Sequence, residues 1–314
     1  MACPNASAPL NIVASDKTCN SKCAYSFQYP ISNMIISNKG EYLKLNTEVL
    51  TNLPPVQYRQ SGYLLQEGRL YVPSIHTYGA ENETAQAELI LIHTSVTSSN
   101  TLLVCVPIKR TANSGSDAAT LLDLLINEAK KSANAEGQQT TLSITKQSLD
   151  AFIPLKKFSS YKGTLPFNEH CESKVHYIVF ALEDAAEISV EAYSFLNKRG
   201  MGSLIRKHKF QTVAPEKNPG GLFKSTNAAQ KLSRTKGGSD DIFIDCQPTG
   251  ADGEVLVPNN KTSAQMFETD TLRRVLENGL FQSLIGVILM VGILTVGKAM
   301  LKKLSAPSKA VGVA

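Results

Sequence analysis

The chain has 314 residues, a formal net charge of +5 at pH 7 and a hydrophobic content of 42%. This length allows one large domain with additional segments, and the ordinary apolar content excludes a wholly disordered chain. The six cysteines are spread along the sequence, which excludes a small scaffold built on disulfide bonds.

The N-terminal ten residues are polar and contain no apolar core segment, so we expect no secretory signal peptide. Cys19 and Cys23 follow, separated by three residues and without a second cysteine pair nearby. A single pair of this kind is a weak zinc signal, because structural zinc sites have four ligands. Cys105 and Cys171 lie in apolar segments and are expected to be buried thiols.

Three apolar segments predict the centre of a β-sheet. Residues 88–93, 102–108 and 175–182 are short and rich in Val, Leu and Ile, which is typical of strands rather than helices. Apolar runs without polar alternation indicate strands that are buried on both faces. Clusters of Gly, Asn and Ser between such segments favour a mixed or antiparallel sheet.

Two helices are predicted beside this sheet. Residues 117–132 place leucines and an isoleucine at helical spacing, with Asp117 able to cap the start of the helix. Lys130 and Lys131 suit its C-terminal end, where the helix dipole is negative. A second, shorter helix is predicted over residues 189–197.

Residues 63–93 carry the most informative pattern. Residues 69–77 read Arg-Leu-Tyr-Val-Pro-Ser-Ile-His-Thr, and residues 88–93 read Glu-Leu-Ile-Leu-Ile-His. Both segments resemble the core of the α-carbonic anhydrase family, in which two adjacent strands carry three zinc-binding histidines. The resemblance extends over residues 8–205. Its further matches lie at residues 8–13, 37–45, 103–109, 161–166 and 171–180.

The same resemblance implies that the zinc ligands are missing. Aligned on the segment that contains His76, the first two ligand positions hold Arg69 and Tyr71, and the third holds Ile90. These three side chains cannot build a three-histidine zinc site, and without zinc there is no metal-bound hydroxide at neutral pH. We therefore predict a degenerate carbonic anhydrase that is not an enzyme and has no catalytic residues, metal or cofactor.

Other positions bear on this prediction. Pro166 stands where the family has a threonine that orients the zinc-bound hydroxide, and the chain has no tryptophan, which the zinc enzymes commonly use around the site. Glu88 matches a glutamate that supports a zinc-bound histidine in the family, and His93 is interpreted as a structural histidine. If Arg69 faces inward, Glu88 is its nearest candidate charge partner.

We expect an α+β fold, with a carbonic-anhydrase-like mixed, mainly antiparallel sheet, peripheral helices and one C-terminal transmembrane helix. The predicted parts are a carbonic-anhydrase-like domain (1–205), a basic extended arm with a short strand (206–268), a membrane-proximal helix (269–279), a transmembrane helix (280–297) and a basic tail (298–314).

The segment 198–236 is strongly basic, with ten Lys and Arg residues against one acidic residue, Glu216. It has few aromatic residues, so base stacking and sequence-specific nucleic-acid binding are not expected. The segment either docks on acidic neighbouring subunits, binds a polyanion such as a sulfated glycan, or is a solvated linker. The candidate binding residues are Lys198, Arg199, Arg206, Lys207, Lys209, Lys217, Lys224, Lys231, Arg234 and Lys236.

The C-terminal part of the sequence predicts a membrane anchor. Residues 240–250 favour a short strand, which ends at Pro248. Residues 280–296 carry no charge, and this length is near the minimum of about 17 residues for a spanning helix. Lysines follow the span, where they suit a membrane interface. Without a signal peptide, the large domain is expected on the cytoplasmic side during assembly.

These features lead to one leading hypothesis. Catalytically silent relatives of this fold with a C-terminal anchor resemble proteins that large DNA viruses carry. The leading hypothesis is a non-enzymatic structural protein of such a virus particle, a membrane-anchored minor capsid protein. It would link the internal membrane to the capsid, with capsid proteins and the lipid bilayer as partners. The alternative is a host-attachment protein that binds sulfated glycans, and a working zinc hydratase is the third hypothesis.

Overall fold

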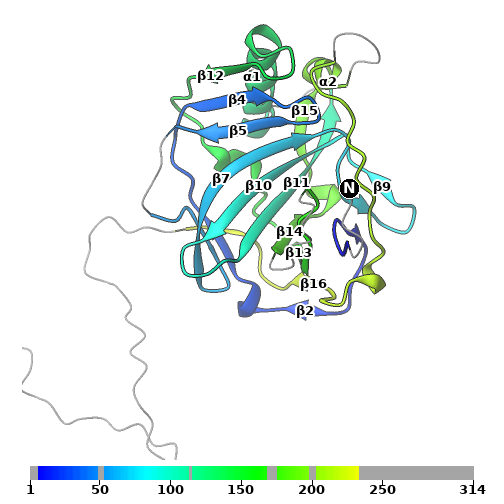
Figure 1. Cartoon of the computed structure of the whole chain (residues 1–314). Coiled ribbons are helices and arrows are strands. Elements are labelled where there is room, and N and C mark those ends of the chain that lie inside the picture. The colour runs from blue at the N-terminus through cyan, green and yellow to red at the C-terminus, as the bar shows by residue number, and fades with distance from the viewer. Residues whose placement is uncertain (1–5, 49–52, 113–114, 168–174, 198–202, 233–314) are drawn as a thin grey trace, which may run out of the picture. The chain divides into compact units, whose positions relative to one another are not determined.

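A large mixed sheet forms the centre of the protein (Figure 1). The computed structural model describes residues 6–48, 53–112, 115–167, 175–197 and 203–232. The strands are β1 Asn11–Ile12, β2 Thr18–Cys19, β3 Tyr25–Phe27, β4 Met34–Asn38, β5 Leu43–Thr47, β6 Val56–Tyr58, β7 Ser61–Tyr71, β8 Thr77–Tyr78, β9 Glu83–Thr84, β10 Ala87–Ser95, β11 Thr101–Thr111, β12 Gln139–Leu142, β13 Phe158–Gly163, β14 Val175–Phe180, β15 Ala186–Ser189, β16 Leu222–Ser225 and β17 Gln230–Lys231.

The main sheet runs in the order β12-β4-β5-β7-β10-β11-β14-β13-β16-β2. Most neighbouring pairs are antiparallel, while β11 pairs in parallel with β14 and with β15. A second branch joins β17, β3 and β6 to β7. β1, β8 and β9 form a separate three-stranded sheet. The sheet is therefore mixed and mainly antiparallel, as the sequence predicts.

The central strands are buried on both faces. In β10, Leu89 and Leu91 belong to the core on one face of the sheet, and Ile90 belongs to the core on the other face. β11 alternates in the same way, with Val104 on the first face and Cys105 on the second. This arrangement explains why the sequence shows continuous apolar runs here instead of polar alternation.

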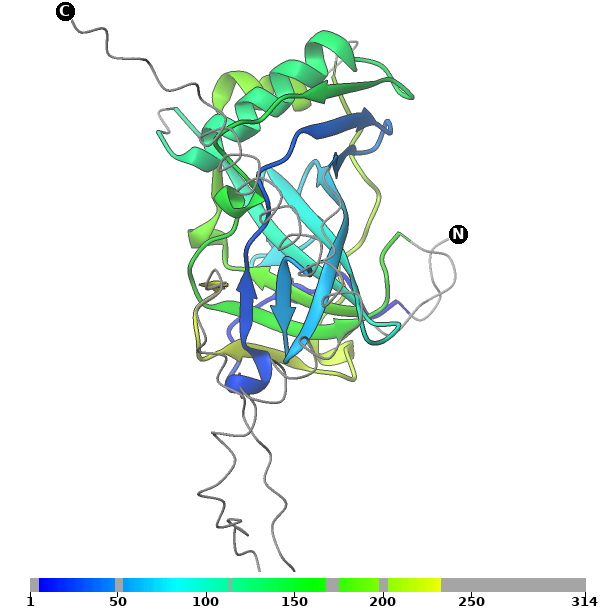
Figure 2. The same cartoon turned by 90° about the vertical axis from the view of Figure 1, so that its left-hand side faces the viewer.

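Both predicted helices are present. α1 spans Asp117–Ser132, and its N-cap is Ser116, whose Oγ accepts a hydrogen bond from the backbone N–H of Ala119. α2 spans Val190–Leu196 and is capped in the same way by Ser189. Figures 1 and 2 show the two helices together at one end of the sheet, and β2 and β16 at the other. Short 3-10 turns cover Ser21–Cys23, Leu149–Phe152, Leu182–Asp184 and Pro215–Lys217.

Residues 203–232 belong to the folded body of the protein. β16 pairs with β13, and β17 pairs with β3. Leu204 and Ile205 are buried, and the amide of Asn38 donates hydrogen bonds to the carbonyls of Leu204 (2.8 Å) and Ala133 (3.2 Å). Leu222 and Ala229 are buried as well, so apolar side chains beyond the predicted boundary at residue 205 complete the core.

Several predictions fall on residues that the structure does not describe. They concern Cys171, Lys198, Arg199, Arg234, Lys236, the strand within 240–250 and the segments 269–279, 280–297 and 298–314. Within the described part of the chain, no helix combines the length and the apolar character that crossing a membrane requires.

Candidate functional site

The pairing of β7 with β10 places the three aligned positions side by side. Arg69 and Ile90 are direct partners across the two strands, and Tyr71 lies two residues further along β7. Tyr71 and Ile90 are both buried in the same apolar cluster. The sheet therefore brings together the side chains that the resemblance assigns to one site.

Arg69 is held there by a carboxylate and by aromatic rings. Its Nε and Nη2 atoms each lie 2.5 Å from Oε1 of Glu67. Its Cζ atom lies 4.7 Å from the ring centroid of Tyr42 and 4.1 Å from that of Phe167, within the range of cation–π attraction. Its Nη1 atom donates a hydrogen bond to the hydroxyl of Tyr71 at 3.4 Å. The guanidinium group is thus packed among partners.

The charge partner of Arg69 is Glu67, so the prediction of Glu88 is wrong. Glu67 lies two residues before Arg69 on β7 and therefore on the same face. It also pairs with Lys44. Burial alone would raise the pKa of the Glu67 carboxyl, but Lys44 and Arg69 together lower it. Glu67 is therefore ionised at neutral pH between two cations.

These positions do not suit a zinc ion. Arg69 stays protonated and has no acceptor atom, and Ile90 has no donor for a metal. Burial raises the pKa of Tyr71 to about 12, against the opposing effect of Arg69, so the phenol is neutral at pH 7. These three side chains therefore provide no set of ligands for zinc.

A second polar group is buried nearby and was not predicted as a unit. The Nδ1 atom of His76 lies 2.6 Å from Oε1 of Glu88, and its Nε2 atom lies 2.7 Å from the hydroxyl of Tyr161. The other oxygen of Glu88 accepts hydrogen bonds from the backbone N–H groups of Ile75 and His76, at 2.7 and 3.1 Å. His76 and Glu88 are both 0% exposed. Every polar atom of these two side chains therefore has a partner.

Cys105 completes a group that can hold a metal ion. One ligand atom each from His76, Glu88 and Cys105 lies within 4.8 Å of the other two. Imidazole, carboxylate and thiolate are the side-chain groups that bind zinc. Burial raises the pKa of the Cys105 thiol well above its ordinary value. A bound ion would have to deprotonate this thiol and displace hydrogen bonds of His76 or Glu88.

The sequence contained part of the signal for this group. His76 and Glu88 both match the family pattern, and Cys105 lies in a predicted strand. Only the register of β10 with β11, which sets Cys105 opposite Ile90, shows that the thiol faces the same side as Glu88. The three residues are brought together by strand pairing rather than by a sequence motif.

His93 is a structural histidine, as the sequence predicts. Its Nδ1 atom donates to the carbonyl of Leu102 at 3.2 Å. Its Nε2 atom lies 2.7 Å from the hydroxyl of Tyr29 and accepts from it. Burial lowers the pKa of His93 to about 4, so the ring is neutral at pH 7.

Cys19 and Cys23, whose spacing is only a weak zinc signal, form a disulfide bond. Cys19 and Cys23 are linked, with their Cα atoms 5.6 Å apart. Their sulfur atoms are therefore not free to bind a metal. Cys105 is a free, buried thiol, as predicted.

The described basic residues of the segment 198–236 do not gather at the aligned positions. Arg206 pairs with Glu136 at 2.8 Å, and Lys231 pairs with Asp150 at 2.7 Å. Four other lysines are exposed, and no ion pair joins them to an acidic residue of the described chain. These four lie at separate points along residues 207–224 and are here called the lysine surface: Lys207, Lys209, Lys217 and Lys224.

Comparison with known proteins identifies the fold through structure. No sequence family and no characterised protein matches the chain by sequence. The carbonic anhydrase Cah3 of Chlamydomonas reinhardtii matches with a TM-score of 0.55 and 15% identity, over 70% of this chain and 91% of that one. Dioscorin, solved with ascorbate, matches with a TM-score of 0.54 and 14% identity, over 73% and 87%. A hyperthermostable carbonic anhydrase from a hydrothermal vent chimney matches with a TM-score of 0.52 and 17% identity, over 71% of this chain and 88% of that one.

These likenesses support the predicted fold in its coarser form, mainly β with few helices and similar to carbonic anhydrases. The prediction that the chain is no enzyme is wrong. Its structural neighbours include carbonic anhydrases, and His76, Glu88 and Cys105 form a group that can hold a metal ion. Arg69, Tyr71 and Ile90 supply no zinc ligands, but the chain has other side chains that can bind a metal.

Proposed function

We propose that the chain is a membrane-anchored structural protein of a large DNA virus particle, which ties the internal membrane to the capsid through its carbonic-anhydrase-like domain. The proposal concerns what the protein connects, and it does not depend on whether the buried His76 group carries a metal. The apolar sequence of residues 280–296 supports the anchor.

The lysine surface is the observation that carries this proposal. Its backbone is fixed to the body, because β16 pairs with β13 and the carbonyl of Pro9 accepts a hydrogen bond from Val213 at 2.8 Å. Lys207, Lys209, Lys217 and Lys224 are therefore presented by a folded surface rather than by a free arm. Ordered cations without acidic partners in the described chain suit a fixed acidic surface on a neighbouring protein.

Stripping and cross-linking of purified particles test this proposal. When the outermost proteins are removed, we expect the chain to stay with the membrane fraction. A short amine cross-linker is expected to join the lysine surface to capsid proteins, while Lys131 on α1 serves as an exposed control. Release of the chain with the outermost proteins would contradict the anchor. Retention on heparin that falls steeply with salt, without capsid cross-links, would instead favour attachment to sulfated glycans.

A second candidate function follows from the buried group. The fold is similar to that of carbonic anhydrases, and His76, Glu88 and Cys105 are the residues that would hold zinc. Bound zinc lowers the pKa of its water ligand to about 7, which is the basis of CO₂ hydration. All three side chains are 0% exposed, so this candidate requires a route for substrate.

Metal analysis of the purified chain decides this second candidate. The second candidate function predicts one zinc per chain and measurable CO₂ hydration, and both are expected to be lost in Cys105→Ser. The control is Cys19→Ser combined with Cys23→Ser, which removes sulfur atoms away from the buried group and should leave zinc unchanged. A chain that binds no metal and does not hydrate CO₂ would reject the candidate.

A further inference from the structure

A cavity of about 590 Å³ lies at the end of the sheet that carries β2 and β16. Its wall combines the 3-10 turn Ser21–Cys23, the turn between β6 and β7, and parts of β13, β14 and β16. None of the described residues that line it is acidic. Arg69, His76 and Glu88 do not line this cavity, although its lining residue Tyr161 contacts Nε2 of His76 through its hydroxyl.

Three cations from three different elements line this cavity. Lys22 belongs to the 3-10 turn, Arg59 to the turn after β6, and Lys162 to β13. No ion pair joins any of them to an acidic residue in the described ranges. Three converging positive charges without a carboxylate make this wall attractive to an anion.

The floor of the cavity is polar, and one of its side chains has no hydrogen-bond partner among the described residues. His176 is 7% exposed, and within the described structure no hydrogen bond joins its ring to another residue. It lies opposite Lys162 across the β13–β14 pair, and its ring contacts the ring of Tyr58. The hydroxyls of Tyr58 and Ser160 lie 2.6 Å apart. An imidazole that lines a cavity and has no hydrogen-bond partner among the described residues is available to a ligand.

The electrostatics of His176 agree with this geometry. Burial, followed by the charges of Lys162 and Arg59, lowers the pKa of His176 to about 4. The titratable groups that line the cavity beside it are Lys22, Arg59, Lys162 and the phenol of Tyr58, whereas the phenol of Tyr161 is bonded to His76. An anion among them would offset the cations and raise the pKa of His176.

The turn that presents Arg59 has an unfavourable backbone. Arg59 and Gln60 both adopt left-handed conformations, with φ of 52° and 63°. Two-residue hairpin turns of this kind favour Asn and Gly, because other side chains cost about 1 kcal/mol or more in this region. Backbone strain of this sort is common where a side chain is positioned for binding.

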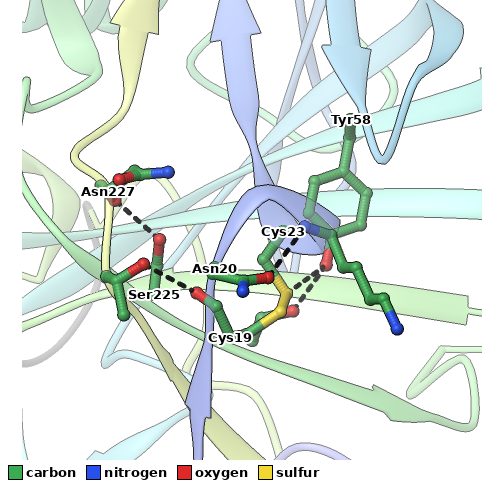
Figure 3. Close-up of a disulfide and its surroundings, with 9 residues drawn as sticks. Cys19, Asn20, Cys23, Tyr58, Ser225 and Asn227 are labelled. Carbon is green, nitrogen blue, oxygen red and sulfur yellow. Dashed lines mark hydrogen bonds between the residues drawn. A yellow bond between two sulfur atoms is a disulfide. The ribbon is translucent and has the colours of Figure 1, made fainter.

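The disulfide bond fixes the opposite wall. Cys19 and Cys23 enclose the 3-10 turn that carries Lys22 (Figure 3). Cys23 lies against Tyr58, whose hydroxyl is 3.9 Å from the sulfur. The bond therefore holds Lys22 close to the polar floor, so less ordering is needed when a ligand binds.

We propose that this cavity binds a phosphate or sulfate monoester of monosaccharide size. The three cations and the hydroxyls suit a tetrahedral oxyanion, which accepts charge-assisted hydrogen bonds. The volume falls within the range of about 300–1,000 Å³ for small-molecule sites and exceeds what a lone ion needs. Phe223 adds an apolar wall against which the carrier of the ester can pack. This site is independent of the proposed function and of the lysine surface.

Calorimetry on the full chain in detergent tests the ligand class. Glucose 6-phosphate and glucose 6-sulfate are titrated beside glucose and inorganic phosphate. We expect at least one ester to bind, at least tenfold more tightly than inorganic phosphate, with no binding of glucose. Equal affinity for the ester and for inorganic phosphate would overturn the proposal that the cavity also binds the sugar part of the ester. Absence of binding by both esters and by phosphate at millimolar concentration would overturn the site.

Exposed variants then locate the binding. Arg59→Gln and Lys162→Gln are each expected to weaken ester binding at least tenfold, while Lys131→Gln, a matched charge removal on α1, is expected to leave it unchanged. By NMR, the ester should raise the pKa of His176 by at least one unit and leave His93 unshifted. An unaltered His93 signal in each variant shows that the fold is intact. Equal weakening by all three variants, or an unshifted His176, would overturn the proposal.

Discussion

Replacement of His76 by alanine is expected to lower the free energy of unfolding of the domain by about 3–5 kcal/mol, because it leaves a buried carboxylate without its partner. His76 and Glu88 are both 0% exposed, and Oε1 of Glu88 has His76 as its partner at 2.6 Å. Water cannot reach this oxygen to replace the imidazole. Denaturant unfolding of the full chain, followed by circular dichroism, measures the loss.

Tyr161→Phe is the matched control for this prediction. It removes the hydrogen bond to Nε2 of His76 but keeps the ring that stacks on Tyr177 at 4.4 Å. We expect a loss of about 1–2 kcal/mol, the usual cost of one missing buried hydrogen bond. If His76→Ala lowers the free energy of unfolding no more than Tyr161→Phe does, the His76–Glu88 pair does not stabilise the domain as predicted. Glu88→Gln, which keeps the shape and removes the charge, then separates the effect of charge from that of packing.

Acidification from about pH 6.5 to about pH 4 is expected to destabilise the domain by roughly 3 kcal/mol through His93 alone, since one pKa unit corresponds to about 1.4 kcal/mol. Burial lowers the pKa of His93 to about 4 in the folded state. The unfolded chain therefore takes up a proton in this pH window that the folded chain excludes. The stability that neutral, buried His93 contributes is fully present above the pKa of this residue in the unfolded chain. It decreases as the pH falls toward the pKa of His93 in the folded state. Unfolding curves at pH 7, 5.5 and 4 measure this loss.

Other titratable groups also destabilise the domain on acidification, so a variant is needed to isolate the contribution of His93. The pKa values of His176 and His208 are also lowered, chiefly by burial. At lower pH the ionised Glu67 carboxyl, whose pKa is lowered by Lys44 and Arg69 against the effect of burial, loses its contribution as well. His93→Gln is expected to reduce the slope of the free energy of unfolding against pH between about pH 6.5 and pH 4. The reduction corresponds to the uptake of up to one proton on unfolding. An NMR titration of His93 with a midpoint near its ordinary value would contradict the prediction.

The local elements could be predicted because their signals are local. α1 follows from leucines at helical spacing and a polar residue at its start, although the cap is Ser116 rather than Asp117. The strands β10, β11 and β14 follow from short apolar runs. The end of the domain could not be predicted in this way, because Leu222 and Ala229 look like part of a basic loop until their burial is seen.

The partner of Arg69 shows a second limit of sequence reasoning. Strand logic correctly placed Arg69 and Ile90 on neighbouring strands, but it favoured Glu88 as the counter-ion. Glu88 contacts His76 and two backbone amides instead, and Glu67 takes the place beside Arg69. Strand alternation places Glu67 on the face of Arg69, and only the structure shows that the Glu88 carboxylate already has other partners.

The sequence by itself determined the central apolar strands and the two helices. Only the tertiary structure decided that His76, Glu88 and Cys105 meet, and that Lys22, Arg59 and Lys162 surround His176. The reason is physical: hydrophobic periodicity and capping act between residues a few positions apart. A binding site depends on strand register and turn geometry, which join residues that are distant along the chain.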